Sequence, residues 1–186
     1  MQGMTSHTLF VERVPSAVGT IVLLTDEQER LRALDWDDHS DRMHRLLRLH
    51  YVSRGNPTGV SRGAGSVTLI DRRSASSARR ALEAYLSGDL TAIDSVPVET
   101  GGTPFQRGTW AALRRIPAGQ TKSYGALAAD VGRPRAIRAV GLANGANPIG
   151  IVVPCHRVIG ADRSLTGYGG GLDRKRWLLA HESAKL

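Results

Sequence analysis

The stretch SYGALAADVGRPRAIRAVGLAN, residues 123–144, predicts two short helices joined by a tight turn. Ser123 can cap a first helix over residues 124–131, because a serine side chain accepts a hydrogen bond from the free N–H groups of a first helical turn. Gly132 ends that helix, and Pro134 suits the start of a second helix that runs to the end of the stretch. This layout is typical of a helix-turn-helix, although helix pairs of this form also occur in many proteins that bind no DNA.

More helix is expected on both sides of this pair. Thr103 as N-cap and Pro104 at the first helical position open a helix that runs to about Arg115. Residues 172–184 have amphipathic spacing and form a last helix. The apolar run 149–153, directly before Pro154, indicates a buried strand.

The first third of the chain is rich in strand-forming residues. Helices are expected over 37–50 and over 76–87, and residues 53–66 have the composition of a loop. The fold class is therefore α+β, with a small N-terminal β-sheet and helix domain, residues 1–98, and a mostly helical C-terminal domain, residues 99–186. β-branched and aromatic runs predict strands at 8–14, 18–25 and 31–36.

Composition restricts the location and the cofactors. The chain has no apolar stretch of 18 residues and no N-terminal charged region followed by an apolar one, so we expect a soluble, cytoplasmic protein without a membrane span. A single cysteine cannot form an internal disulfide. The histidines of the N-terminal third have no recognisable metal spacing, and we expect neither a metal nor a cofactor. These histidines are His7, His39, His44 and His50.

The positive charge lies in one half of the chain. Residues 1–100 carry 12 Lys and Arg against 13 Asp and Glu, whereas residues 101–186 carry 13 against 4. A polyanion such as DNA is the partner that fits this asymmetry, because neutralised phosphates release counterions. A basic surface that serves only solubility remains the alternative.

The segment PCHRVIG, residues 154–160, contains the only cysteine. A thiol reacts as its thiolate, and Cys155 has His156 beside it as a proton acceptor and Arg157 as a cation. Neighbouring side chains diverge on any regular backbone, so we expect a water to relay the proton between Cys155 and His156. The alternative is that Cys155 is a small buried hydrophobe, as many lone cysteines are.

This segment closely resembles the active-site motif of the O6-alkylguanine-DNA alkyltransferases, the methylated-DNA–protein-cysteine methyltransferases. The likeness in identity and spacing covers about residues 76–184, whereas the N-terminal third resembles the family only loosely, mainly around 16–24. The further matching motifs are TPFQ at 103–106, KSYG at 122–125, RAVG at 138–141, ANP at 146–148, GYGGG at 167–171 and LLAHE at 178–182.

The resemblance implies a mechanism. Cys155 takes the alkyl group from O6 of guanine, and also from O4 of thymine, in a single irreversible turnover. His156 withdraws the thiol proton through a water, and Glu182 orients His156, unless Glu182 is an ordinary solvated surface carboxylate. Tyr124 neutralises the departing guanine. Asn147 ties the active-site turn to the helix pair.

The resemblance also implies a base pocket and a DNA face. Double-stranded DNA is bound through its minor groove, the damaged nucleotide rotates out, and Arg138 enters the space that it leaves. The protein is expected to be a monomer in solution, with cooperativity on DNA left open. The implied pocket residues are Val153, Pro154, Val158, Tyr168 and Gly169. The implied DNA contacts are Ser123, Arg135, Ala136, Ala139 and Gly141, although close packing against another helix explains the small residues equally well.

Two other functions remain open at this stage. Cys155, His156 and Glu182 also suit a cysteine hydrolase or acyltransferase. A non-catalytic protein that only binds alkylated bases is the second alternative. The family likeness further implies that residues 1–98 form a ribonuclease H-like supporting domain.

Overall fold

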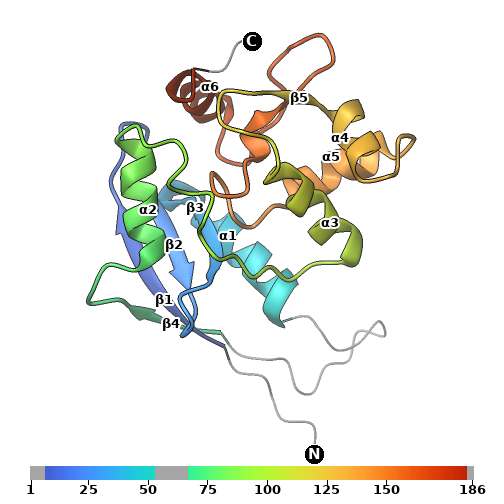
Figure 1. Cartoon of the computed structure of the whole chain (residues 1–186). Helices are drawn as coiled ribbons and strands as arrows, with labels where there is room; N and C mark the ends of the chain where they lie inside the picture. The colour runs from blue at the N-terminus through green and yellow to red at the C-terminus, as the bar shows by residue number, and fades with distance from the viewer. Residues whose placement is uncertain (1–6, 53–66, 184–186) are drawn as a thin grey trace, which may run out of the picture.

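The structure is a computed structural model that describes residues 7–52 and 67–183 (Figure 1). The predicted loop 53–66 lies outside the described residues. Four strands form a sheet in the order β3-β2-β1-β4, in which β1, β2 and β3 pair antiparallel and β4 pairs parallel to β1. The strands are β1 His7–Val14, β2 Ile21–Thr25, β3 Leu31–Trp36 and β4 Val67–Asp71.

The three predicted strands are confirmed, with β2 starting three residues later than expected. The central strand β2 is buried along its whole length and sends alternate side chains to opposite faces of the sheet. Val22 and Leu24 pack against α1 (Ser40–Leu47) on one face, and Ile21 and Leu23 face a larger core that includes α2 (Ser77–Leu86). The edge strand β4 has no counterpart among the predicted strands, because four of its five residues are exposed and show no alternation.

The remaining helices lie close to their predicted positions. Thr103 and Gln106 form a capping box at the start of α3, and Ser123 caps α4 by accepting a hydrogen bond from the Ala126 N–H at 3.1 Å. The predicted helix 37–50 is a 3-10 turn, α1 and then a π-helical turn. The helices are α3 Pro104–Leu113, α4 Tyr124–Asp130, α5 Ile137–Gly145 and α6 Leu172–His181.

Two helix ends were predicted wrongly. Helix α5 begins at Ile137 rather than Pro134, because residues 133–136 form a separate turn closed by the Ala136 N–H and the Arg133 carbonyl. Helix α6 ends at His181, and Glu182 is its C-cap rather than an interior residue.

The predicted strand over residues 149–153 is wrong. Ile149 makes one bridge to Leu34 of β3, after which the chain turns back on itself, with Ile151 at a φ of 66°. The Val153 N–H bonds to the Ile149 carbonyl at 3.0 Å instead of a neighbouring strand, so the run is a buried loop. Its apolar residues serve the core rather than a sheet, and Cys155 opens a 3-10 turn, Cys155–Arg157.

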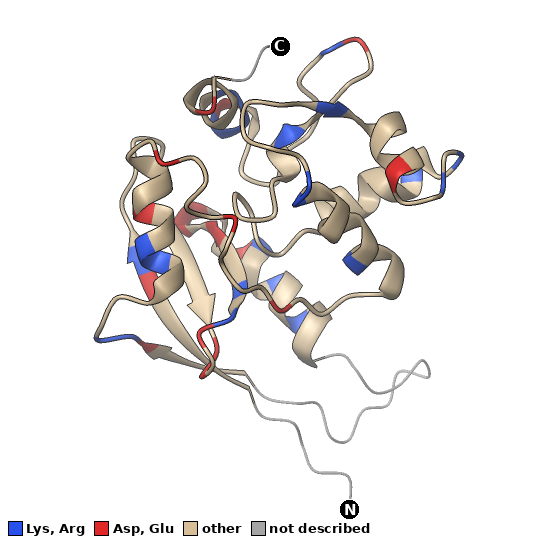
Figure 2. Cartoon of the chain, in the orientation of Figure 1, with Lys and Arg blue, Asp and Glu red and all other residues tan. Residues whose placement is uncertain are grey.

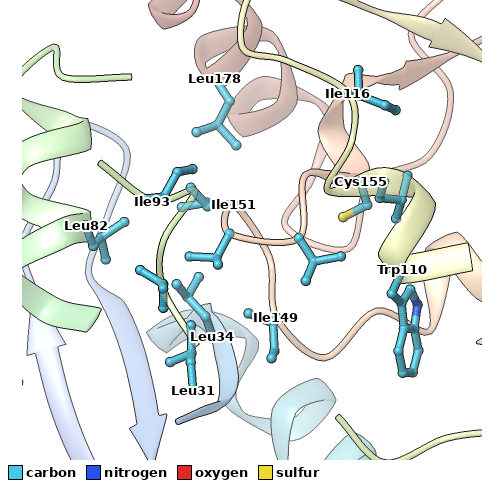
Figure 3. Close-up of a cluster of buried hydrophobic side chains, with 14 of the residues drawn as sticks. Leu31, Leu34, Leu82, Ile93, Trp110, Ile116, Ile149, Ile151, Cys155 and Leu178 are labelled. Carbon is cyan, nitrogen blue, oxygen red and sulfur yellow. The ribbon is translucent and has the colours of Figure 1, made fainter. Parts of the chain in front are cut away.

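One large core joins the sheet to the C-terminal helices. Figure 3 shows Leu34 of β3, Leu82 of α2 and Leu178 of α6 around the loop residue Ile151, with Cys155 and Trp110 of α3 together at one side of the cluster. A two-stranded parallel pair, β5 (Lys122–Ser123) with β6 (Val158–Ile159), supports the active-site segment. The cysteine is therefore positioned by packing from both halves of the chain.

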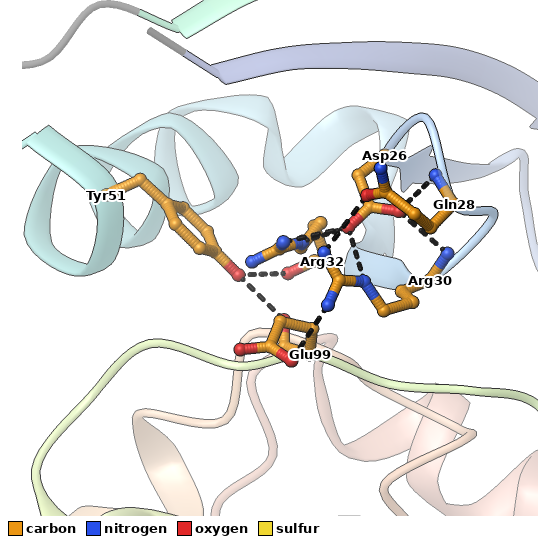
Figure 4. Close-up of polar contacts among 6 residues, drawn as sticks. All are labelled: Asp26, Gln28, Arg30, Arg32, Tyr51 and Glu99. Atoms are coloured by element: carbon orange, nitrogen blue, oxygen red, sulfur yellow. Dashed lines mark hydrogen bonds and ion pairs between the residues drawn. The ribbon is translucent and has the colours of Figure 1, made fainter. Parts of the chain in front are cut away.

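A polar network also links the halves. Asp26 accepts hydrogen bonds from Arg30 and Arg32, both at 2.8 Å, while Arg30 reaches Glu99 at 3.4 Å (Figure 4). The Tyr51 hydroxyl donates to the carbonyls of Arg32 and Glu99 at 3.1 and 3.0 Å. None of the helices within residues 7–52 and 67–183 is long and apolar enough to cross a membrane.

Candidate active site

Cys155 lies at the start of the 3-10 turn with 5% of its surface exposed. Burial raises the pKa of its thiol above the ordinary 9.0, and a hydrogen bond with Asn147 and the charges of Arg42 and Lys175 offset only part of this effect. The resting thiol is therefore protonated at neutral pH. Its reaction requires a base that takes the proton.

His156 is held as a neutral base. Its Nε2 lies 3.0 Å from Oε1 of Glu182, and both side chains are fully buried. The carboxylate can only accept, so Nε2 carries the hydrogen and Nδ1 keeps a lone pair. Burial lowers the pKa of His156 below 6.5, although Glu182 works in the opposite direction. Among the described residues Nδ1 has no hydrogen-bond partner, so it is the nitrogen available to accept a proton.

Glu182 is not a surface carboxylate. Burial alone would raise its pKa, but hydrogen bonds from His156 and Arg157 and the charge of Arg157 lower the pKa far below 4.5. Arg157 donates through Nε to Oε2 at 2.9 Å and through Nη2 to Oε1 at 2.7 Å, and the Tyr85 hydroxyl donates to Oε1 at 2.7 Å. Four donors therefore keep this buried carboxylate ionised.

Asn147 braces the loop that carries the cysteine. Its Nδ2 donates to the carbonyls of Val153 at 2.8 Å and Ile149 at 3.3 Å, and its Oδ1 accepts from the Ile149 N–H at 3.0 Å. Asn147 follows α5, so one side chain connects the end of that helix to the active-site loop. This geometry matches the contact expected of it.

A cavity of about 320 Å³ lies between Tyr124, the C-terminal half of α5 and residues 166–169, without Cys155 or His156 in its lining. Tyr124 forms part of its wall, and the Thr166 hydroxyl donates a hydrogen bond to the Tyr124 oxygen at 3.2 Å. With its oxygen accepting from Thr166, Tyr124 keeps its own O–H for a ligand in the cavity. The lining residues are Tyr124, Gly141, Asn144, Gly145, Thr166, Gly167, Tyr168 and Gly169.

The other three predicted pocket residues do not line this cavity but lie in the protein interior. Val153, Pro154 and Val158 are buried. The Val158 carbonyl accepts from Nζ of the buried Lys175 at 2.6 Å, and the same amine donates to the Thr166 carbonyl at 2.7 Å. Burial lowers the pKa of Lys175 to about 8. Lys175 thus fixes the active-site turn to the loop that carries Thr166.

An arginine side chain from the N-terminal region explains why residue 169 is a glycine. A Cβ atom at residue 169 would lie 2.5 Å from the guanidinium carbon of Arg42. Arg42 pairs with Asp35 and donates to the carbonyls of Gly145 and Asn147, both at 3.1 Å. The absent side chain at 169 therefore leaves room for a cation that contacts the cavity wall.

The predicted DNA face is accessible. Arg135, Arg138 and Ala139 are exposed, and Ala136 and Gly141 are half-buried. The apolar side chains of Ile137 and Leu142 on the same helix are 49% and 72% exposed. Figure 2 shows Lys and Arg on the turn between α4 and α5 and on the loop that precedes α6. Among residues 7–52 and 67–183, no group of three or more His, Cys, Asp or Glu is placed to hold a metal ion.

Comparisons with known proteins show the family to which this chain belongs. The family described as 6-O-methylguanine DNA methyltransferase, DNA binding domain, matches residues 104–184. A methylated-DNA–protein-cysteine methyltransferase of Salmonella typhimurium is 50% identical over 185 residues, which cover 96% of this chain and 98% of the relative. This chain belongs to the methylated-DNA–protein-cysteine methyltransferase family.

Solved structures of the family share the fold. A variant of Mycobacterium tuberculosis OGT is 39% identical with a TM-score of 0.71, covering 96% of this chain and 94% of that one. A crystal structure of Mycobacterium tuberculosis OGT in complex with DNA is 37% identical with a TM-score of 0.67, covering 93% and 92%. The expected α+β class is confirmed.

Several site residues were missed by sequence reasoning. Arg157 was noted only as a cation near Cys155, whereas it is the ion-pair partner of Glu182. Lys175 and Thr166 lie between the motifs that carry the family resemblance, and no local pattern in the sequence predicts their contacts. Tyr85 and Arg42 reach the site from the N-terminal half, and no spacing in the sequence connects them with Cys155.

The Arg157→Met variant is expected to lose about 3–5 kcal/mol of unfolding free energy, because it leaves the Glu182 carboxylate buried without its cation. Urea unfolding followed by circular dichroism measures the loss. Arg176→Met is the matched control, because Arg176 pairs with Asp173 at the surface and its removal should cost less than about 1 kcal/mol. Equal losses in the two variants would contradict the buried ion pair.

Proposed function

We propose that this protein repairs O6-alkylguanine in DNA by transferring the alkyl group to Cys155 irreversibly, once per molecule. The observation that carries the proposal is the neutral His156 next to the only cysteine, held by Glu182 and with Nδ1 unpartnered among the described residues. Tyr168, which lines the cavity together with Tyr124, has its ring 6.4 Å from that of His156. The membership of the family and a relative solved with DNA support the same reaction.

The reaction balances within these residues. The thiol proton of Cys155 passes through a water to Nδ1 of His156, and Glu182 stabilises the resulting imidazolium. As this proton leaves, the sulfur forms a bond to the alkyl carbon and the bond from that carbon to O6 breaks. The guanine departs with its electron pair and takes the proton of the Tyr124 O–H, and the proton held by His156 returns to Tyr124 through solvent. The thioether has no leaving group that this site can expel, so the protein is consumed.

In the proposed complex, the predicted pocket residues contact the guanine base. The main-chain carbonyl of Val158 accepts from the exocyclic amine of guanine, with one lone pair still available beside its bond to Lys175. The Tyr168–Gly169 backbone faces O6. Val153 and Pro154 form the buried wall behind the base. O4-alkylthymine is a second substrate of the same site.

DNA binding uses the exposed face of α4 and α5. In the proposed complex, helix α5 acts as the recognition helix of a helix-turn-helix in the minor groove, where base edges carry little sequence information and a lesion in any context can be found. Arg138 fills the space that the everted nucleotide leaves. Arg135 and Ser123 contact the backbone, and the small residues Ala136, Ala139 and Gly141 let it approach.

The remaining assignments complete the proposal. The protein acts as a cytoplasmic monomer, without a metal or a cofactor. Residues 1–98 form a ribonuclease H-like domain that supports the reactive domain, residues 99–186. A cysteine hydrolase or a non-catalytic binder is not favoured, because the relatives are named as methyltransferases and Cys155 is present with a complete relay.

The decisive experiment mixes the protein with duplex DNA that contains O6-methylguanine and then weighs the intact protein by mass spectrometry. One methyl group should appear on Cys155, in an amount equal to the lesion repaired. Cys155→Ser should show no added mass while retaining DNA binding. Methyl transfer by this variant, or repair of more lesions than there are protein molecules, would refute the proposed function.

The transfer rate should be nearly independent of pH between about 6.5 and 9. The pKa of His156 is lowered below 6.5, so the neutral base persists as pH falls through that value and is lost only at lower pH. The pKa of Cys155 is raised above 9.0, so thiolate formed without the base contributes only at higher pH. Single-turnover rates measured across this range check the prediction. A fall centred at pH 6.5 would place an unperturbed histidine in the relay.

Arg138→Ala should slow repair in duplex DNA about tenfold or more, while the reaction with the free base O6-methylguanine stays within about twofold of the wild type. The reason is that Arg138 stabilises the everted nucleotide, and a free base needs no eversion. Parallel rate measurements on the two substrates separate the effects. Arg163→Ala, in the exposed loop before α6, is a matched control for lost positive charge. Equal slowing on both substrates would exclude the role in base eversion.

A further inference from the structure

Tyr85 connects the N-terminal half of the chain to the proposed relay. It lies in α2, is fully buried, and its hydroxyl donates to Oε1 of Glu182 at 2.7 Å. The same oxygen accepts from His156 at 3.0 Å and from Arg157 at 2.7 Å. Tyr85 and His156 therefore share one carboxylate oxygen across a sequence separation of 71 residues, the difference between positions 85 and 156.

Glu182 needs such a donor because of its position. It is the C-cap of α6, where the helix dipole is negative and disfavours a carboxylate. It is also 2% exposed, so water does not solvate its charge. Arg157 supplies two donors from the 3-10 turn, and Tyr85 supplies the only donor that comes from outside the active-site segment among the described residues.

The position of Tyr85 is itself fixed. Its carbonyl accepts from Nε2 of His181 at 2.8 Å, and its ring makes an edge contact with that imidazole at 5.1 Å between centroids. His181 in turn stacks on Trp177 at 4.9 Å. At its other end, α2 is anchored where Glu12 of β1 accepts from the Ser76 N–H at 3.0 Å. Helix α2 thus carries a rigid connection from the sheet to the carboxylate.

We propose that Tyr85 is a positioning residue for alkyl transfer, whose hydroxyl orients Glu182 and limits the negative charge that this carboxylate presents to His156. The inference rests on the proposed function and extends it. It gives the N-terminal region a role in the chemistry beyond support. Tyr85 does not touch the substrate, and it acts through Glu182.

The proposal predicts the direction of a pH effect. Without the Tyr85 hydroxyl, Oε1 of Glu182 carries more unshared negative charge, and both the carboxylate and His156 bind protons more readily. The acid limb of the pH–rate profile must then move to higher pH. The other polar groups around the pair, all unchanged by the substitution, are Arg157 on the 3-10 turn, Lys175 and His181 on α6, and Tyr168 on the preceding loop.

The test compares single-turnover methyl transfer from O6-methylguanine in duplex DNA by the wild type and by Tyr85→Phe, as a function of pH. The ring and its packing remain in this variant, and only the donor is lost. The rate on the plateau should fall about 3- to 10-fold, and the acid limb should rise by about half to one pH unit. Tyr51→Phe is the matched control, because the Tyr51 hydroxyl bonds to the carbonyls of Arg32 and Glu99 and its loss should leave the profile in place.

A second variant keeps the test valid if Tyr85→Phe does not fold. Replacement of Tyr85 by 3-fluorotyrosine retains the hydroxyl and makes it a stronger donor, so the acid limb should move to lower pH. An unchanged acid limb in either variant, with or without a slower plateau, shows a merely structural residue and overturns the proposal. If the wild-type protein transfers no methyl group, the proposed function itself is wrong. If the wild type transfers methyl normally and Tyr85→Phe has the same pH profile, only the role of Tyr85 is wrong.

Discussion

The buried carboxylate of Glu182 is the constraint around which the site is arranged. A charge that is 2% exposed at the negative end of α6 is unfavourable unless donors surround it, and four donors from three side chains do so. Two of those side chains, His156 and Arg157, follow Cys155 directly. The carboxylate therefore fixes the 3-10 turn that presents the thiol, as well as the tautomer of the base.

The two halves of the chain meet at this constraint. Tyr85 reaches Glu182 from α2, and Arg42 reaches the carbonyls of Gly145 and Asn147 from α1, on the opposite face of the sheet. Helices on the two faces of the sheet therefore each contact residues that support the active-site segment. The two halves share one hydrophobic core, in which Leu34 of β3 packs against the active-site loop, and this packing fixes the positions of those contacts.

Local chemistry explains what could be predicted from the sequence. The helix caps Ser123 and Thr103 can be predicted because each side chain bonds to a backbone N–H only three residues further along the chain. The reactive segment can be predicted from Cys155 and the two residues that follow it. The loop 149–153 was misread as a strand because apolar content alone does not distinguish a buried strand from a buried loop. Contacts such as that of Tyr85 with Glu182 depend on how distant segments pack, which no spacing along the chain encodes.

The charge states at rest explain how a reactive cysteine remains inert until it meets a lesion. Burial keeps the proton on Cys155 and keeps it off His156, so neither partner is charged at rest. Proton transfer creates a thiolate and an imidazolium together. The imidazolium is stabilised by the carboxylate of Glu182. Within the described residues the thiolate has no comparable partner, since Asn147 and the charges of Arg42 and Lys175 offset its burial only in part. The ion pair thus becomes favourable only as the sulfur transfers its charge to the departing base, so nucleophile and substrate must be activated in the same step.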